Sequence, residues 1–194
     1  MAPADPAARE FETHVDATLQ LSCELARALT GAHQAAMSLI VKGDWRHARK
    51  YFSLSEEYAA FRGFTMPARG VGLHALVVTE NSALRLSQAE VERHPAWRGY
   101  AEARGAHPPL RGLLAVPIVG ADGLNYGLLQ SSDKVNGGDF DDADERNLRR
   151  LADLASLTLD ALGKVRDLRG GADVPTRERE PLASFVQIES LEED

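Results

Sequence analysis

Two apolar segments joined by a tight turn constrain the fold of this chain more than any other feature. Residues 113–119 and 126–132 are rich in aliphatic side chains. The six residues between them, G-A-D-G-L-N, include glycine, aspartate and asparagine, which favour turns. This pattern predicts an antiparallel hairpin, and its hydrophobicity places the hairpin at the centre of a sheet. The length of 194 residues indicates one domain with a tail or long terminal helices.

Two longer segments have the spacing of amphipathic helices. In residues 7–29, one face carries Phe11, Val15, Thr18, Ser22, Leu25 and Leu29. Residues 141–168 form the longer segment, which begins with acidic residues that suit the positive end of a helix dipole. Its first apolar seam is Leu148, Leu151, Ala155, Leu159 and Leu162, and its second is Leu154, Leu157, Ala161, Val165 and Leu168. The second seam is either part of one wide buried stripe or the contact surface of a homodimer.

Shorter elements are predicted between these landmarks. We predict strands at 35–41, 45–53 and 83–86, and helices at 71–80 and 88–93. Ser87 and Glu90 have the spacing of a capping box at the start of the last of these. Residues 54–70 lack periodicity and contain several aromatic side chains, which is typical of a long functional loop.

The C-terminal residues differ in composition from the rest of the chain. We therefore divide it into a domain, residues 1–169, and an acidic, flexible tail, residues 170–194, which opens with two glycines and ends in L-E-E-D. Within the tail, residues 182–191 hold several large apolar side chains. Such a run predicts a docking segment, either on this domain or on a partner.

Charge and hydropathy exclude several functions. The formal net charge of −7 argues against a nucleic-acid partner. The apolar run at 113–119 is too short to cross a membrane, and the N-terminus does not resemble a secretory signal, so we expect a cytoplasmic protein without a membrane partner. The single cysteine, Cys23, excludes an intrachain disulfide, and the spacing of the histidines predicts no metal site.

Several strings of residues resemble GAF sensor domains of bacterial signalling proteins and sensor histidine kinases. They are H-P-P-L-R-G-L-L-A-V-P-I at 107–118, G-L-L-Q-S-S-D-K at 127–134 and F-D-D-A-D-E at 140–145. The resemblance implies an α+β fold, in which an antiparallel sheet of five or six strands has the N- and C-terminal helices packed on one face. Loops and short helices on the ligand side would cover the other face.

The resemblance also implies a function. A GAF-type domain of this kind would be sensory or regulatory, would bind a small molecule and would signal through a partner protein without catalysing a reaction. We expect a homodimer formed through the terminal helices. The alternative is a dimerisation or protein-interaction module that binds no ligand.

In this family the ligand cavity lies between the sheet and the loops. The residues expected to line it are Tyr51, Tyr58, Phe61, His74, Val78, Arg85, Trp97, His107, Leu114 and Gln130. Arg85 and Arg111 are candidates for binding an anion, although an ion pair of Arg85 with Glu90 or Glu92 is the simpler expectation. Trp97 is expected to pack in the core rather than to stack on a ligand.

The identity of the ligand stays open. His107 occupies the position of the proximal histidine in similar haem-binding GAF sensors, but a structural role for its H-P-P-L-R string is the favoured interpretation, so haem is a disfavoured cofactor and His107 a metal ligand only if haem is bound. Asp133-Lys134 followed by Phe140 and Asp144-Glu145 resembles the pattern of nucleotide-binding members. Here aspartate replaces asparagine, and a lysine–carboxylate pair that fixes the loop is the favoured interpretation.

Two further activities of the family require a cysteine in the loops. These are the attachment of a bilin and the reduction of free methionine sulfoxide. Cys23 lies instead within the first predicted helix, where it is expected to be a half-buried small hydrophobic residue. Neither activity is therefore predicted.

Overall fold

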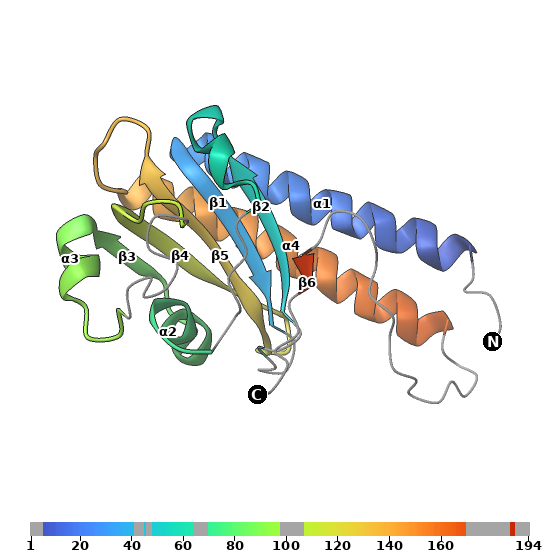
Figure 1. The fold of residues 1–194 in the computed structure, drawn as a ribbon. Helices are drawn as coiled ribbons and strands as arrows, with labels where there is room; N and C mark the ends of the chain where they lie inside the picture. The colour runs from blue at the N-terminus through green and yellow to red at the C-terminus, as the bar shows by residue number, and fades with distance from the viewer. Residues whose placement is uncertain are drawn as a thin grey trace, which may run out of the picture.

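An antiparallel sheet of six strands separates two long helices from the shorter ones (Figure 1). This computed structural model describes residues 6–40, 45, 48–63, 70–97, 107–169 and 187–188, with the backbone alone at 6–13, 164–169 and 187–188. The order of the strands across the sheet is β3-β4-β5-β1-β2-β6. The α+β fold expected from the sequence, with the N- and C-terminal helices on one face, is confirmed.

The elements follow one another in the order that the sequence predicts, with two additions. They are α1 (Pro6–Thr30), β1 (Ala32–Leu39), β2 (Arg49–Leu54), the 3-10 helix η3 (Glu56–Phe61), α2 (Leu73–Glu80), β3 (Leu84–Ser87), α3 (Gln88–Arg93), β4 (Gly112–Val119), β5 (Asn125–Lys134), α4 (Asp142–Arg169) and β6 (Gln187–Ile188). The additions are η3 and β6. Of the predicted strands at 35–41 and 45–53, residues 41, 46 and 47 lie outside the described residues.

The predicted hairpin is the centre of the sheet. β4 and β5 pair antiparallel, and β5 pairs on its other side with β1. Leu114, Val116 and Leu129 point from these strands toward α1 and α4 and are fully buried there. On the opposite face Leu113 and Leu128 join a second core, which lies under α2 and α3. Both faces of the hairpin are therefore covered, which explains its nearly continuous apolar sequence.

The side of α1 that contacts the sheet differs from the predicted one. Leu25 is 39% and Leu29 53% exposed, whereas Leu19, Cys23 and Ala26 are buried. The prediction for Leu25 and Leu29 was therefore wrong. Small side chains at Cys23 and Ala26 let the helix lie close to the strands, so the larger leucines turn outward. The side chain of Phe11 lies outside the described residues.

The two seams of α4 have different environments. Leu148, Leu151 and Ala155 of the first seam are buried against the sheet. Leu154 and Leu157 of the second seam are 45% and 66% exposed, so the two seams do not form one buried stripe. The side chains of Val165 and Leu168 lie outside the described residues. No helix in the described part of the chain has the length and hydropathy to cross a membrane.

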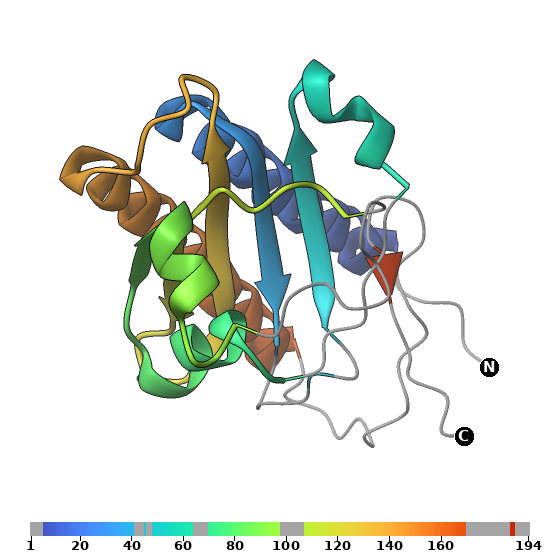
Figure 2. The same ribbon diagram turned by 60° about the vertical axis from the view of Figure 1, so that its left-hand side comes forward.

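The C-terminal end of β5 holds both long helices. The N–H of Val135, which follows β5, donates to the carbonyl of Gly31, which follows α1, at 2.8 Å. Lys134 donates to Asp144 in the first turn of α4 at 2.6 Å. α1 therefore ends where α4 begins, and the two helices run antiparallel, side by side (Figures 1 and 2).

A short strand of the tail pairs with the edge of the sheet. β6 lies antiparallel to β2, with Ile188 opposite Arg49 and Gln187 opposite Lys50. This pairing occupies part of the edge that β2 would otherwise expose. The remainder of the predicted docking segment 182–191 lies outside the described residues.

Candidate functional site

Two buried polar atoms on β5 have no hydrogen-bond partner at normal distance and angle among the described residues. They are Oε1 of Gln130 and Oγ of Ser132, in side chains whose residues are 8% and 1% exposed. Because they are two residues apart on a strand, both side chains point to the same face of the sheet, the one that α2 covers. A buried polar group without a partner costs about 1–3 kcal/mol. Such a pair is therefore the strongest indication of a binding site in the described part of the chain.

The neighbouring strands present small side chains beside Gln130. In the pairing register Ala36 of β1 lies on one side of Gln130, and Ala115 of β4 lies on the other. Directly opposite residues in an antiparallel pair point to the same face. The Gln130 side chain is therefore flanked on both sides by the methyl groups of alanines.

His74 on α2 faces this part of the sheet. Burial lowers the pKa of its imidazole to about 4, and the positive charge of Lys50 acts in the same direction. Interaction with the side-chain amide of Gln130 opposes the shift. At neutral pH the ring is therefore uncharged, with one nitrogen able to donate a hydrogen bond and the other able to accept one.

The low pKa of His74 predicts how stability changes with pH. Its ordinary pKa is 6.5 and its folded pKa is about 4, so between these values the unfolded chain binds the extra proton. Stability from this group is complete above pH 6.5 and is lost as the pH falls toward 4. Between pH 7 and pH 5 the loss amounts to about 2 kcal/mol. We expect urea unfolding of His74→Gln to show a correspondingly smaller decrease than the natural chain. Equal decreases in both proteins would contradict this environment for His74.

His107 lies on the same side of the sheet. Its Nδ1 makes a short hydrogen bond to the carbonyl of Pro108, as donor, because the carbonyl can only accept. Burial lowers the pKa of its ring, whereas the Pro108 carbonyl and the charge of Asp133 raise it. His107 is close enough to His74 to affect the pKa of that imidazole. His74, His107 and Gln130 are thus the predicted site residues that the fold brings together.

Comparison with known proteins identifies the family. The family model described as "GAF domain" matches residues 12–160. The chain belongs to the GAF domain family. This match covers most of both long helices and all five of the strands that precede α4, so the resemblance seen in the sequence is confirmed.

Solved structures of several other proteins share the fold. A free methionine-R-sulfoxide reductase from Thermoplasma acidophilum superposes with a TM-score of 0.58 at 16% identity, covering 78% of this chain and 96% of that one. The PixJ GAF domain of Thermosynechococcus elongatus superposes with a TM-score of 0.59 at 14% identity, covering 86% of this chain and 95% of that one. A GAF domain/HD domain protein from Geobacter sulfurreducens superposes with a TM-score of 0.59 at 18% identity, covering 78% of this chain and 95% of that one. At these identities the likeness concerns the fold alone.

Three of the predicted cavity residues of this GAF domain point to the other face of the sheet. Tyr51 and Leu114 are buried in the core beneath α1 and α4. The Tyr51 hydroxyl donates to Asp16 of α1 at 2.6 Å. Arg85 pairs with Asp142 and Glu145 of α4, rather than with Glu90 or Glu92. The alternation of side chains along a strand places these three away from His74, so they do not share its site.

Tyr58 and Arg111 belong to a polar cluster at one end of the sheet. The Tyr58 hydroxyl donates to the Asp133 carboxylate at 2.6 Å, and the Arg111 guanidinium donates to the Tyr58 oxygen at 2.8 Å. The backbone N–H of Arg111 also donates to Asp133. His33 stacks on the Tyr58 ring with centroids 4.5 Å apart. We call Tyr58, Arg111, Asp133 and His33 the Asp133 cluster, and it fixes η3 to β5.

The remaining predicted residues have packing roles. Phe61 meets the ring of Tyr58 edge to face, with centroids 5.7 Å apart. Val78 and Trp97 pack against the core beneath α2, as expected for Trp97. Lys134 pairs with Asp144 at 2.6 Å, which is the lysine–carboxylate pair that the structural interpretation of this pattern predicts.

Sequence reasoning missed Ser132 and Lys50 as site residues. Ser132 follows Gln130 by two positions on a strand that was itself predicted, so strand alternation could have placed them together. Nothing in the sequence indicates that Lys50 lies near His74, because the two residues come from different elements. Among the described residues, no group of three His, Cys, Asp or Glu side chains is arranged to hold a metal ion.

Proposed function

We propose that this GAF domain is a cytoplasmic sensory module that binds a small polar molecule on the α2 face of its sheet. It acts through a protein partner and catalyses no reaction itself. The observation that carries the proposal is the pair of buried atoms Gln130 Oε1 and Ser132 Oγ. Among the described residues Ser132 Oγ has no partner, and the Gln130 side chain has only its interaction with His74. A ligand that donates a hydrogen bond to Gln130 and exchanges one with Ser132 would satisfy both. The neutral ring of His74 can serve either as donor or as acceptor to the same molecule.

The environment of Cys23 supports a role without catalysis. Its residue is fully buried, and its thiol donates to the Tyr51 carbonyl at 3.3 Å. Burial raises the pKa of this thiol far above its ordinary value. Since the thiolate is the reactive form, Cys23 is unsuited to nucleophilic or redox chemistry. It is the only cysteine of the chain, which argues against the activity of the Thermoplasma reductase here.

The residues around His107 do not fit a haem. The groups that act on His107 and on its neighbour His74 include Asp133, Lys50 and the Gln130 amide, which are charged or polar. This donor set favours a smaller, hydrogen-bonding ligand.

Two neighbouring serines provide the test of this site. Ser131 points toward the helices, where its hydroxyl donates to the Thr30 oxygen at 3.0 Å, because Thr30 donates its own proton to the Ala26 carbonyl. Ser132 points toward α2 and lacks a partner. We expect Ser131→Ala to reduce the free energy of unfolding by about 1 kcal/mol, and Ser132→Ala to leave it unchanged or slightly higher.

Ligand binding should show the opposite order. Native mass spectrometry of the chain purified from cells is expected to show a bound small molecule that Ser132→Ala and Gln130→Leu reduce and Ser131→Ala retains. A Soret band would identify haem instead and would refute a polar ligand. A protein that carries nothing, and whose melting temperature no metabolite in a broad panel changes, would support the ligand-free interaction module.

The outer surface of α1 and α4 supports homodimerisation. Gln20 and Arg27 of α1 hydrogen-bond to β2, so this flank faces the sheet edge. Leu21, Leu25 and Leu29 recur every four residues on the other flank, toward α4. On α4, Ser156 and Asp160 reach the β4–β5 hairpin, so Leu154 lies on the flank toward α1 and Leu157 on the outward side. The exposed leucines therefore lie on the outer surface of the two helices, and we propose that a second copy covers it as a helical bundle.

Replacing Leu157 by glutamate is expected to yield a monomer. This leucine is 66% exposed, so the folded monomer loses little, whereas the buried charge in the dimer would weaken association by about 30-fold or more. Leu124→Glu is the matched control, because Leu124 is also exposed but lies in the β4–β5 turn. Analytical ultracentrifugation distinguishes the results. A monomeric natural chain, or a control that dissociates equally, would contradict this interface.

A further inference from the structure

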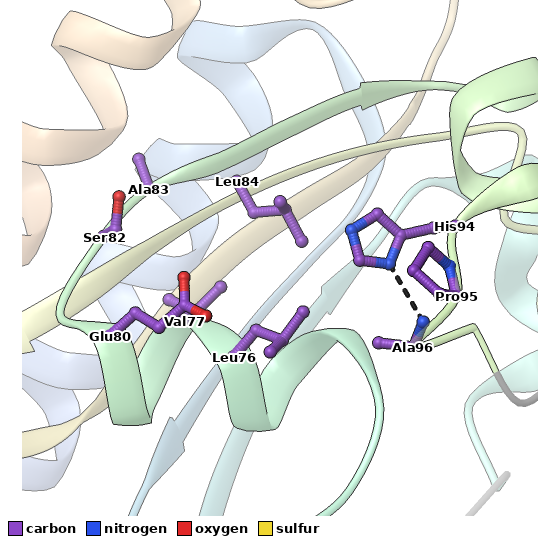
Figure 3. A pocket seen from close by; sticks show the side chains of 9 residues that line it. All are labelled: Leu76, Val77, Glu80, Ser82, Ala83, Leu84, His94, Pro95 and Ala96. Carbon is purple, nitrogen blue, oxygen red and sulfur yellow. Dashed lines mark hydrogen bonds between the residues drawn. The ribbon is translucent and has the colours of Figure 1, made fainter.

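A second cavity lies beside α2, and its lining residue Leu84 is two strands across the sheet from Gln130. Its volume is about 510 Å³, within the range of small-molecule sites. Its lining, drawn in Figure 3, is Leu76, Val77, Glu80, Ser82, Ala83, Leu84, His94, Pro95 and Ala96. None of these residues belongs to the proposed ligand site. We call this space the α2–β3 cavity.

The floor of the α2–β3 cavity is apolar. Leu76 and Val77 come from α2 and Leu84 from the start of β3, and their side chains point toward one another (Figure 3). Val77 is buried, and Leu84 packs against the same core as Val77. The floor is therefore continuous with the core. An apolar molecule that covered it would bind favourably, because apolar surface would be removed from water.

His94 provides a hydrogen-bond donor at one end. The backbone N–H of Ala96 donates to Nδ1 of His94 at 3.1 Å, drawn as a dashed line in Figure 3. Because Nδ1 accepts, the proton of the neutral ring is on Nε2. Figure 3 shows this nitrogen on the side of the ring nearer Leu84. An occupant can therefore present an acceptor or a π face to His94 Nε2–H.

Glu80 provides a negative charge at the other end. It lies in the last turn of α2, which contains no basic residue. The helix dipole disfavours an acidic group at a C-terminus. Among the described residues its carboxylate has no hydrogen bond or ion pair. An acidic side chain placed against local preference beside a cavity is a candidate for ligand binding.

We infer that the α2–β3 cavity binds a small organic amine. Its protonated nitrogen pairs with Glu80, its apolar body covers Leu76 and Leu84, and its far end meets His94. The charge of Glu80 selects against organic anions of the same shape. The volume accommodates an aromatic or branched aliphatic body rather than a simple ammonium ion.

Titration of the full ¹⁵N-labelled chain with phenethylamine, followed by NMR, tests this inference. The matched probes are 2-phenylethanol, which lacks the charge, and 3-phenylpropionate, which reverses it. We expect amide shifts at residues 76–84 and 94–96, with the amine binding tighter than the alcohol and the acid weakest. Glu80→Gln should weaken the amine by about two- to fivefold, as expected for an exposed ion pair. Glu92→Gln, on α3 and outside the cavity, should leave the affinity unchanged.

Ala96→Phe gives an independent test, because its ring would occupy the cavity. It should reduce amine affinity at least tenfold while the spectrum retains the dispersion of a folded protein. Shifts centred on Gln130, equal affinity for amine and acid, or unchanged affinity in Ala96→Phe would each overturn the inference. If Ala96→Phe fails to fold, the comparison of probes and Glu80→Gln decides alone.

Discussion

Gly127→Ala is expected to reduce the free energy of unfolding by more than about 4 kcal/mol, which is large for a single substitution. Gly127 lies in the middle of the sheet, on β5 between β4 and β1. A Cβ atom there would lie 1.9 Å from the carbonyl oxygen of Ser38. Its φ of 138° is a conformation that side chains rarely adopt. The oxygen belongs to the backbone of β1, so β1 and β5 would have to separate.

The matched control is Gly123→Ala. Gly123 also has a positive φ, 80°, but a Cβ atom there would meet nothing within 4 Å. Gly123→Ala should reduce the free energy of unfolding by only about 1–2 kcal/mol, because of the backbone conformation alone. Urea unfolding followed by circular dichroism compares the two. If both variants lose the same stability, the close approach of β5 to Ser38 is not present in solution.

Asp133→Ala is expected to cost about 3 kcal/mol, because it leaves a buried cluster without its acceptor. Asp133 is 3% exposed and accepts hydrogen bonds from the Tyr58 hydroxyl and the Arg111 backbone. Its φ of 56° is left-handed, a conformation that alanine tolerates less well than aspartate or asparagine. Loss of the carboxylate should also release η3, which Tyr58 attaches to β5.

Two milder variants separate these contributions. Asp133→Asn keeps the backbone preference and an oxygen for Tyr58, so it should lose less than the alanine variant. Tyr58→Phe removes one hydroxyl and should cost about 1 kcal/mol. Urea unfolding of the three proteins should rank them in this order of severity, with alanine worst. A loss below 1 kcal/mol for Asp133→Ala would show that the cluster contributes little to stability.

Most of the fold is predictable because its signals are local. The β4–β5 hairpin follows from apolar runs around a turn, and α3 from the capping box, in which Glu90 accepts from the Ser87 N–H at 2.8 Å. The buried face of α1 is not predictable in the same way. Hydrophobicity favours leucine, but the sheet selects the small residues Cys23 and Ala26, and this choice depends on how closely the two surfaces approach.

The candidate site is only partly predictable, since it depends on side chains from distant elements. His74 and Gln130 were predicted together through a family resemblance and lie together. The sequence did not indicate that Tyr51 and Arg85 point to the opposite face, because the face to which a strand residue points depends on its register. The tail strand β6 likewise requires knowledge of which sheet edge is open.

The contacts at the C-terminal end of β5 connect the candidate site to both long helices. Gln130 and Ser132 lie on the same strand whose last residues hold Gly31 after α1 and Asp144 in α4. A shift of this strand along its axis would pull on both helices at once, and at the end where they meet. In the proposed dimer, the distance between spin labels on the outer surfaces of α1 and α4 would therefore report binding of the proposed ligand beneath α2.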